Sequence, residues 1–334
     1  MADIISLGEL LIDFVPTVTG TDLASAETFK KAAGGAPANV AVGLARLGVP
    51  SAFMGKVGDD PFGRFLAATL QAEGVDTTPL RFEPRARTAL AFVSLRADGE
   101  REFLFYRHPS ADMLFGPGDV DEAAIGRARL LHFGSISLIS EPSRSGTLHA
   151  VATARRRGLR VSYDPNLRLP LWPSVEAARD GLRLGLAQAE IVKIGEEEVA
   201  FLTGTGDPIA GARALWHDDL RLVAVTRGGK GCLWLTRDAE GAVPGFPVEP
   251  VDTTGAGDAF MAGLLAGLLG QPPRGPLDPA ALDRVCLLAN AMGAITTTAR
   301  GAIPSLPGRE AVRAFLAERG LAVELPAAGA EDGR

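Results

Sequence analysis

Residues 252–263 read Asp-Thr-Thr-Gly-Ala-Gly-Asp-Ala-Phe-Met-Ala-Gly, and this stretch decides the fold class. The run before it, residues 248–251, predicts the end of a strand, and the residues from Gly257 onward predict a helix. The small residues between them let backbone amides approach an oxyanion, and the first helical turn adds unpaired N–H groups and positive potential. The stretch therefore predicts an anion hole, with Asp258 placed to accept the proton of an attacking hydroxyl. A second reading, in which Asp258 only starts a helix and the glycines only make a turn, stays open at this point.

Short apolar runs alternate with amphipathic stretches along most of the chain on either side of this motif. The alternation predicts strands connected by helices, hence a mainly parallel sheet covered on both faces. The predicted strands cover residues 4–7, 52–56, 130–133, 160–163, 191–194 and 222–226. The predicted helices cover residues 37–47, 61–73, 144–157, 257–269 and 278–298, where apolar residues recur at helical spacing.

Two stretches, residues 13–31 and 88–106, have strand-like patterns with no helix between them. In the second, Asp98-Gly99 separates two such runs, which is a strong hairpin signal. Strands inserted between strand–helix units predict a small separate sheet that covers a cleft. Residues 326–334 consist mostly of Ala, Gly and acidic residues, which predicts a disordered tail.

Composition and charge exclude several classes of protein. A net charge of −6 argues against a nucleic-acid partner, because phosphate binding needs clustered Lys and Arg. The two cysteines and four scattered histidines lack metal-ligand spacing, which argues against a zinc site. No apolar run approaches the roughly 20 residues that span a bilayer. Because the N-terminus opens directly into strand-like residues, without the regions of a signal peptide, we expect a cytoplasmic protein with no membrane partner.

A second glycine-rich stretch, residues 34–41, reads Gly-Gly-Ala-Pro-Ala-Asn-Val-Ala, and Gly48 and Gly58 follow it. No Gly-Lys-Ser/Thr follows the glycines near residue 255, and residues 6–10 lack a Gly-x-Gly-x-x-Gly fingerprint, which argues against a P-loop and a dehydrogenase. Residues 34–41 and 252–263 resemble the N-terminal and C-terminal motifs of the pfkB family of carbohydrate kinases. The resemblance implies an α/β fold with a ribokinase-like core at residues 1–12, 33–86 and 113–325 and a β lid at residues 13–32 and 87–112.

The resemblance also implies roles for individual residues. It implies that Asp258 is the catalytic base and that the amides of Gly255, Ala256 and Gly257 form the anion hole. A sugar needs several directional donors and acceptors, and the amide of Asn39 offers both. The implied sugar-binding set is Asp13, Gly34, Gly35, Asn39, Phe92, Phe105, Arg107, Arg168 and Asp258.

Nucleotide and magnesium sites follow from the same resemblance. Residues 222–231 resemble the nucleotide-binding strand and turn of these kinases, and Asn290 falls where the family places a residue beside the adenine. Magnesium is expected to neutralise the ATP phosphates, with Glu198 approaching it through water. Where the family often has Asn-x-x-Glu, this chain has Gly195, so that Lys193 or a water takes the place of the asparagine. The implied ATP-binding set is Lys193, Thr226, Arg227, Gly228, Gly229, Gly231, Ala256, Gly257 and Asn290.

Many members of the family bind a monovalent cation such as K⁺ beside the anion hole, largely through backbone carbonyls. They also commonly pair edge strands of the lid between two subunits, which implies a homodimer and fits the tendency of exposed sheet edges to pair. The implied cation-binding positions are Asp252, Thr254, Thr296, Ala299, Gly301 and Ser305.

Long runs outside the motifs, including residues 8–16, 98–107 and 162–173, resemble the fructokinases of the plant and bacterial type. They imply transfer of the ATP γ-phosphoryl group to the 6-hydroxyl of fructose. A 2-keto-3-deoxygluconate kinase is an alternative, because Arg107 and Arg168 match positions that grip a substrate carboxylate in those enzymes. Phe92 and Phe105 stand where the acid-sugar kinases tend to carry tyrosine, which favours a neutral sugar. A noncatalytic interaction subunit is a third alternative, although the intact Asp258 argues against it.

Overall fold

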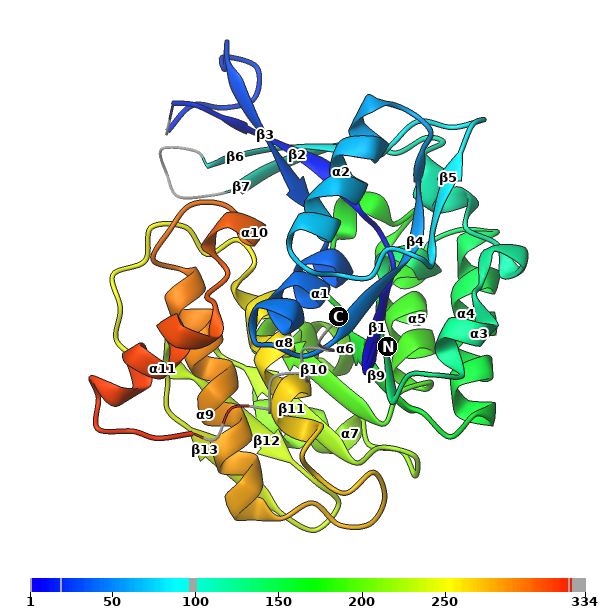
Figure 1. Ribbon diagram of the computed structural model, residues 1–334. Helices are drawn as coiled ribbons and strands as arrows, with labels where there is room; N and C mark the ends of the chain where they lie inside the picture. The colour runs from blue at the N-terminus through cyan, green and yellow to red at the C-terminus, as the bar shows by residue number, and fades with distance from the viewer. Residues whose placement is uncertain (1, 19, 96–100, 324, 326–334) are drawn as a thin grey trace, which may run out of the picture.

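The computed structural model describes residues 2–18, 20–95, 101–323 and 325. Within this part of the chain, nine strands form a central sheet in the order β13-β12-β11-β10-β9-β8-β1-β4-β5 (Figure 1). All neighbouring pairs from β11 to β5 are parallel, whereas β12 and β13 add to one edge in antiparallel orientation. The nine strands are β1 (Ile4–Leu7), β4 (Ser51–Gly58), β5 (Leu80–Glu83), β8 (Leu130–Gly134), β9 (Arg160–Asp164), β10 (Ile191–Gly195), β11 (Leu222–Thr226), β12 (Cys232–Leu235) and β13 (Glu240–Val243).

Helices cover both faces of the central sheet, as the alternating pattern predicts. Neighbouring strand residues point to opposite faces, so Ile4 packs in one hydrophobic core and Ile5 in the other. The core around Ile4 includes residues of α1, α2, α8 and α9, and the core around Ile5 includes residues of α4, α5 and α6. The helices are α1 (Ala36–Arg46), α2 (Pro61–Ala72), α3 (Glu122–Ile125), α4 (Ser143–Arg156), α5 (Val175–Leu186), α6 (Glu196–Thr203), α7 (Pro208–Ala214), α8 (Ala256–Leu268), α9 (Pro279–Thr296), α10 (Ala302–Ser305) and α11 (Arg309–Ala317).

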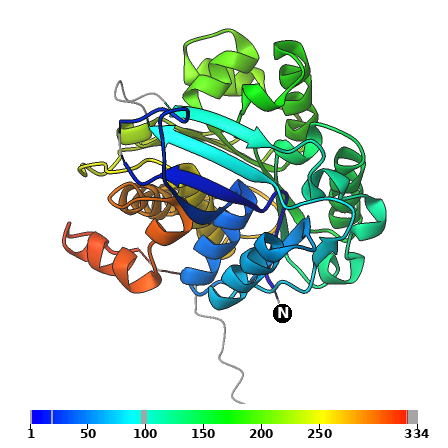
Figure 2. The same cartoon turned by 90° about the horizontal axis from the view of Figure 1, so that it is seen from above.

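A second sheet of four strands lies over one end of the central sheet, as the view from above shows (Figure 2). Its order is β3-β2-β6-β7, with β2 (Leu11–Pro16), β3 (Phe29–Gly34), β6 (Leu90–Leu95) and β7 (Arg101–Tyr106). We call this sheet the lid. Strands β6 and β7 pair as an antiparallel hairpin, while the predicted turn at Asp98-Gly99 and the predicted tail at residues 326–334 lie outside the described residues. Strand β2 begins at Leu11, inside the segment predicted to belong to the core.

The prediction of a strand that ends at residues 248–251 is wrong. Strand β13 ends at Val243, and an irregular segment connects it to α8. This segment contains Pro244, Pro247 and Pro250, which have no backbone N–H to donate to a neighbouring strand. The motif at residues 252–263 therefore joins a loop to a helix. None of the helices that the structure describes has both the length and the apolar character needed to cross a membrane.

Candidate active site

Asp258 lies in the first turn of α8 and is buried, with 8% of its surface exposed. The residue before the helix, Gly255, has φ +81°, in the left-handed region that favours glycine. A Cβ on Gly255 would also lie 3.0 Å from the Cα of Ala302, too close for a side chain to fit. The tight turn leaves the first amides of α8 without helical carbonyl partners, at the positive end of the helix dipole. The start of α8 can therefore hold an anion beside a carboxylate.

Asn39 and Asp258 meet across the site from the first turns of α1 and α8. The Asn39 Nδ2 group donates to Asp258 Oδ2 at 2.7 Å. Its amide oxygen is buried and has no partner among the described residues. Because a buried acceptor without a partner is costly, this oxygen is suited to a hydroxyl of a bound ligand. Burial raises the pKa of Asp258, and the contact with Asn39 and the charges of Lys193 and Arg168 oppose that rise.

Asp13 approaches the same site from the lid strand β2. Its carboxylate lies against Gly34, where a Cβ would overlap with it, so a side chain at position 34 would displace it. Burial raises the pKa of Asp13 to about 7, while Arg168 lowers it and the charge of Asp258 raises it further. The structure thus brings together Asp13, Asn39, Arg168 and Asp258, as predicted.

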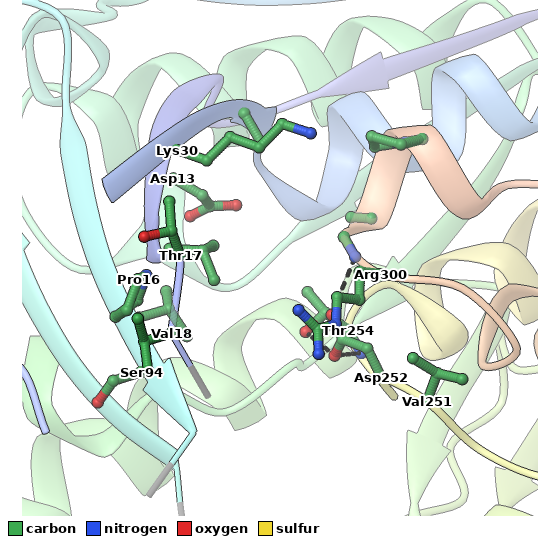
Figure 3. Close-up of a pocket in the computed structure, with 16 residues that line it drawn as sticks. Asp13, Pro16, Thr17, Val18, Lys30, Ser94, Val251, Asp252, Thr254 and Arg300 are labelled. Atoms are coloured by element: carbon green, nitrogen blue, oxygen red, sulfur yellow. Dashed lines mark hydrogen bonds between the residues drawn. The ribbon is translucent and has the colours of Figure 1, made fainter. Parts of the chain in front are cut away.

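A cavity of about 330 Å³ separates the lid from the loops before α8 and α10 (Figure 3). The lid side includes Asp13, Lys30 and Val93, and the core side includes Thr254 and Arg300. Asp13 and Val15 on β2, and Lys30 and Ala32 on β3, are two residues apart, as expected for one face of a sheet. The cavity gives a small molecule a place between the lid and the core.

The two lid phenylalanines predicted to bind sugar point to opposite faces of the lid. Phe105 pairs with Ala91, which pairs with Asp13, so Phe105 shares the inner face with Asp13. Phe92 lies on the outer face, where its ring stacks on Phe14 with centroids 5.0 Å apart. The structure therefore does not bring Phe92 to the sugar side, and this placement is wrong because the pleat of β6 turns the ring away.

The charge of Arg168 affects the pKa of Asp258, whereas Arg107 is paired with a different carboxylate. Its guanidinium is buried and donates through Nε to Asp112 Oδ2 at 3.0 Å, with a second contact from Nη2. The Ser110 hydroxyl donates to the other oxygen of Asp112. Glu9 lies close enough for the charge of Arg107 to lower its pKa, although burial raises that pKa to about 7 overall. Arg107 thus belongs to a buried cluster with carboxylates of its own.

Lys193, predicted to bind ATP, ends in a buried ion pair. Its Nζ lies 3.0 and 3.2 Å from the two carboxylate oxygens of Asp164, which ends the neighbouring strand β9. Glu198, predicted to approach magnesium through water, accepts hydrogen bonds from Gly195 N at 2.8 Å and Leu167 N at 2.6 Å. These groups lie at the carboxyl ends of parallel strands, where open α/β sheets bind ligands.

Several of the other residues predicted to bind ATP lie at the turn after β11. Thr226 ends that strand, and Gly228 to Gly231 make a tight turn, with Gly228 and Gly231 at positive φ. Asn290 lies on α9 and donates from Nδ2 to the carbonyls of Val243 and Pro244 at 3.2 and 3.1 Å. Asn290 therefore holds the chain after β13 against α9, while its role beside a base stays a prediction.

The residues predicted to hold a monovalent cation lie in the loops before α8 and α10, which Asp252 joins, and in the helices α9 and α10 beside them. Asp252 Oδ1 accepts from Thr254 N and Oγ1 at 2.9 and 2.7 Å, and Oδ2 accepts from Gly301 N at 2.9 Å. Ser305 donates to the carbonyls of Gly301 and Ala302. Thr296 ends α9 and is buried, and Ala299 is exposed just beyond it. Among the described residues there is no group of three or more His, Cys, Asp or Glu that could hold a metal.

Three buried carboxylates near the site, Glu9, Asp112 and Asp164, are absent from the predicted set. Asp164 offered a signal, because it is an acidic residue that directly follows the strand predicted at residues 160–163. Glu9 and Asp112 gave no comparable signal. Their partners, Ala36 for Glu9 and Arg107 for Asp112, are recognised only once the chain is folded.

The buried carboxylate of Asp258 at a helix start, paired with Asn39 and close to Asp13 of a β lid, defines a phosphotransferase of the ribokinase-like class. The chain belongs to the pfkB family of carbohydrate kinases, whose family model matches residues 1–309.

Named relatives and solved structures agree with this assignment. Probable fructokinase-7 of Arabidopsis thaliana is 54% identical over 94% of this chain and 92% of its own length. The fructokinase of Xylella fastidiosa, solved with bound ATP, is 37% identical and has a TM-score of 0.84. The match covers 96% of this chain and 100% of the Xylella chain. A double mutant of the Vibrio cholerae fructokinase, solved with fructose, ADP and potassium ion, is 37% identical over 95% of this chain and 98% of its own, with a TM-score of 0.83.

Proposed function

We propose that this protein is an ATP-dependent fructokinase that forms fructose 6-phosphate and ADP. The observation that carries the proposal is the buried pair of Asn39 and Asp258 at the start of α8, in a chain 54% identical to a plant relative named as a fructokinase. Asp258 accepts the proton of the sugar 6-hydroxyl, whose oxygen attacks the γ-phosphorus while the bond to the ADP oxygen breaks. Because burial raises the pKa of Asp258, its carboxylate is a stronger base than an exposed aspartate.

The backbone amides of Gly255, Ala256 and Gly257 stabilise the charge that develops on the transferred group. Asp13, Gly34, Gly35 and Asn39 orient the sugar between the lid and α1. The lid excludes water when it covers the sugar, which limits hydrolysis of ATP.

Magnesium and a monovalent cation are the proposed ions. Magnesium neutralises ATP phosphates, and Glu198 fits a role through water, because both of its oxygens already accept backbone N–H groups. Asp252 joins the loop before α8 to the loop before α10, and these loops carry most of the residues proposed to hold a potassium ion. A potassium ion is named with the Vibrio cholerae fructokinase.

We further propose that the protein is a homodimer formed through the lid and lies in the cytoplasm. On the lid, Leu104 and Tyr106 of edge strand β7 are 47% and 59% exposed, although both are apolar in large part. Exposed apolar side chains on a sheet edge favour contact with a second copy.

A coupled assay of ADP release, run with fructose, 2-keto-3-deoxygluconate, ribose and adenosine, tests the substrate. We expect the highest kcat/KM for fructose, since Arg107 is already paired with Asp112 and is poorly placed to bind an acid sugar. A clear preference for 2-keto-3-deoxygluconate would overturn the choice of sugar and leave the kinase chemistry intact. No activity with any acceptor would instead support a noncatalytic subunit.

A further inference from the structure

The carboxyl ends of β9 and β10 place a second charged pair beside the start of α8. Asp164 ends β9 and Lys193 lies in the neighbouring strand β10, and both side chains are buried, at 3% and 8% exposure. The ammonium group contacts both oxygens of Asp164, at 3.0 and 3.2 Å. Two of its three N–H donors are thereby directed to one carboxylate, and the third remains for another acceptor.

The Lys193 ammonium also lies against the turn that begins α8. A Cβ built on Gly257 would lie 3.0 Å from Lys193 Nζ, so the amine touches the segment proposed to hold the transferred phosphoryl group. The charge of Lys193 is also felt by Asp258, whose pKa it lowers. A cation at this place can stabilise the negative charge of a phosphoryl group in transfer.

We propose that Asp164 is a positioning residue for phosphoryl transfer, which holds the Lys193 ammonium charged and directed at the start of α8. The inference rests on the proposed function, because it assigns the phosphoryl group to the same helix start. Asp164 acts through Lys193 and does not itself touch a substrate.

The charged and titratable groups around Lys193 single out Asp164 as the partner that matters. Glu198 of α6 is committed to two backbone N–H groups, and Asp258 of α8 serves the sugar hydroxyl. His132 of β8 is fully buried, which lowers its pKa to about 3 and leaves it neutral, and Arg168 adds a positive charge near Asp258. Burial lowers the pKa of Lys193, but the neighbouring carboxylates outweigh burial and raise this pKa overall, with the charge of Asp164 as the largest of their contributions. Without Asp164, the amine would lose its proton at a lower pH.

The test is the pH dependence of kcat in the variant Asp164→Asn, with fructose and ATP saturating. We expect kcat to fall by about 10- to 100-fold, consistent with loss of one charged stabilising group, while the KM for fructose changes less than about threefold. We also expect a new loss of kcat as pH rises, at a pH below the ordinary lysine pKa of about 10.4, because the neutral amine becomes dominant there. The double variant Asp164→Asn/Lys193→Arg should lack this alkaline loss, because guanidinium stays charged.

Asp219→Asn is the matched control, since it removes an exposed carboxylate paired with Arg155 at the end of α4. It should leave both kcat and its pH profile unchanged. An unchanged pH profile in folded Asp164→Asn would overturn the proposal. So would equal losses in kcat and in fructose binding.

If Asp164→Asn does not fold, the variant Lys193→Met tests the proposal instead. A kcat of Lys193→Met within about threefold of that of the unaltered enzyme would exclude a role for the pair, because loss of a charge that stabilises the transition state lowers kcat by more than this. Failure of the proposed function has a different signature, because the unaltered protein would then release no ADP with fructose.

Discussion

Asp258 is the residue at which the proposed chemistry is most directly tested. In Asp258→Asn the shape is kept and the hydrogen bond to Asn39 can be remade, but the side chain cannot accept a proton. We expect kcat for fructose phosphorylation to fall by about 10²- to 10⁴-fold, the usual contribution of a general base. ADP release measures kcat, and calorimetry should show that fructose still binds. A variant with near-normal turnover would remove Asp258 from the role of base.

Asn39 tests the sugar side of the same pair. Asn39→Ala removes the donor to Asp258 and the buried amide oxygen that has no partner among the described residues. We expect the KM for fructose to rise about tenfold, which corresponds to about 1.4 kcal/mol, the scale of one hydrogen bond. The KM for ATP should change less than about twofold on this argument, because Asn39 lies on the sugar side. Equal rises in both KM values would contradict the assignment.

The residues of the site differ in how far the sequence predicts them. Asp258 and Asn39 lie in continuous motifs, so local sequence indicates both their chemistry and their place at helix starts. For Phe92 and Arg107 the sequence indicates less. The side to which Phe92 points depends on strand register, and the partner of Arg107 depends on how residues 110–112 fold back after the lid. Neither property can be read from spacing alone.

At the scale of elements, Glu9 joins the end of β1 to the start of α1. Its Oε1 accepts from Ala36 N at 3.0 Å, and burial raises its pKa to about 7, with Arg107 opposing and Asp112 adding to the rise. The folded protein therefore binds the proton of Glu9 more tightly than the unfolded chain. The stabilisation by that proton is complete below about pH 4.5, the ordinary Glu value, and is lost as pH rises through about 7.

Glu9→Gln removes this titration and keeps the side chain's size. We expect the free energy of unfolding of the variant to fall less steeply between pH 5 and pH 8 than that of the unaltered protein, in urea titrations at each pH. Asp13, whose pKa is also about 7, titrates in both proteins and cancels in the comparison. Glu310→Gln is the control, since that exposed carboxylate pairs only with Arg313 among the contacts described. Identical slopes for Glu9→Gln and the unaltered protein would contradict the prediction.

The elements with the clearest apolar patterns are predictable from the chain. All six predicted parallel strands and all five predicted helices are confirmed, because each combines an apolar pattern with clear ends. Strands β5, β12 and β13 of the central sheet and helices α3, α5, α6, α7, α10 and α11 are not among the predicted elements. The strand predicted to end at residues 248–251 contains Pro250 and is absent from the structure. Long-range order was also out of reach, since the pairing of β9 with β10 decides that Asp164 and Lys193 meet.

At the scale of the whole molecule, the active site exists only where two sheets meet. Asp13 comes from the lid and Asp258 from the core, and Arg168 influences the pKa of both. A change that shifts the lid therefore alters the electrostatic environment of the base without touching it. This arrangement links the assembly of the lid to activity.

The outer face of the lid carries an aromatic cluster that ends at an exposed edge. Phe92 contacts Phe14, Phe29 and Tyr106, and the ring of Tyr106 lies 5.6 Å from that of Phe92. Leu104 and Tyr106 point to the same side of β7, because they are two residues apart in a strand. We therefore expect the double variant Leu104→Lys/Tyr106→Lys to convert the proposed dimer into a monomer, because buried charges without partners oppose association.

Sedimentation velocity of the unaltered protein and of this variant, at matched concentrations, measures the change. Leu321→Lys is the control, because Leu321 is also exposed but lies near the C-terminal end of the described chain, beyond α11. We expect the control to stay dimeric. The monomeric variant should keep its fold and bind fructose more weakly, since a lid without its neighbour is held less firmly over the sugar. A dimer that survives both lysines, or an unaltered protein that sediments as a monomer, would show that the lid closes the site without a second subunit.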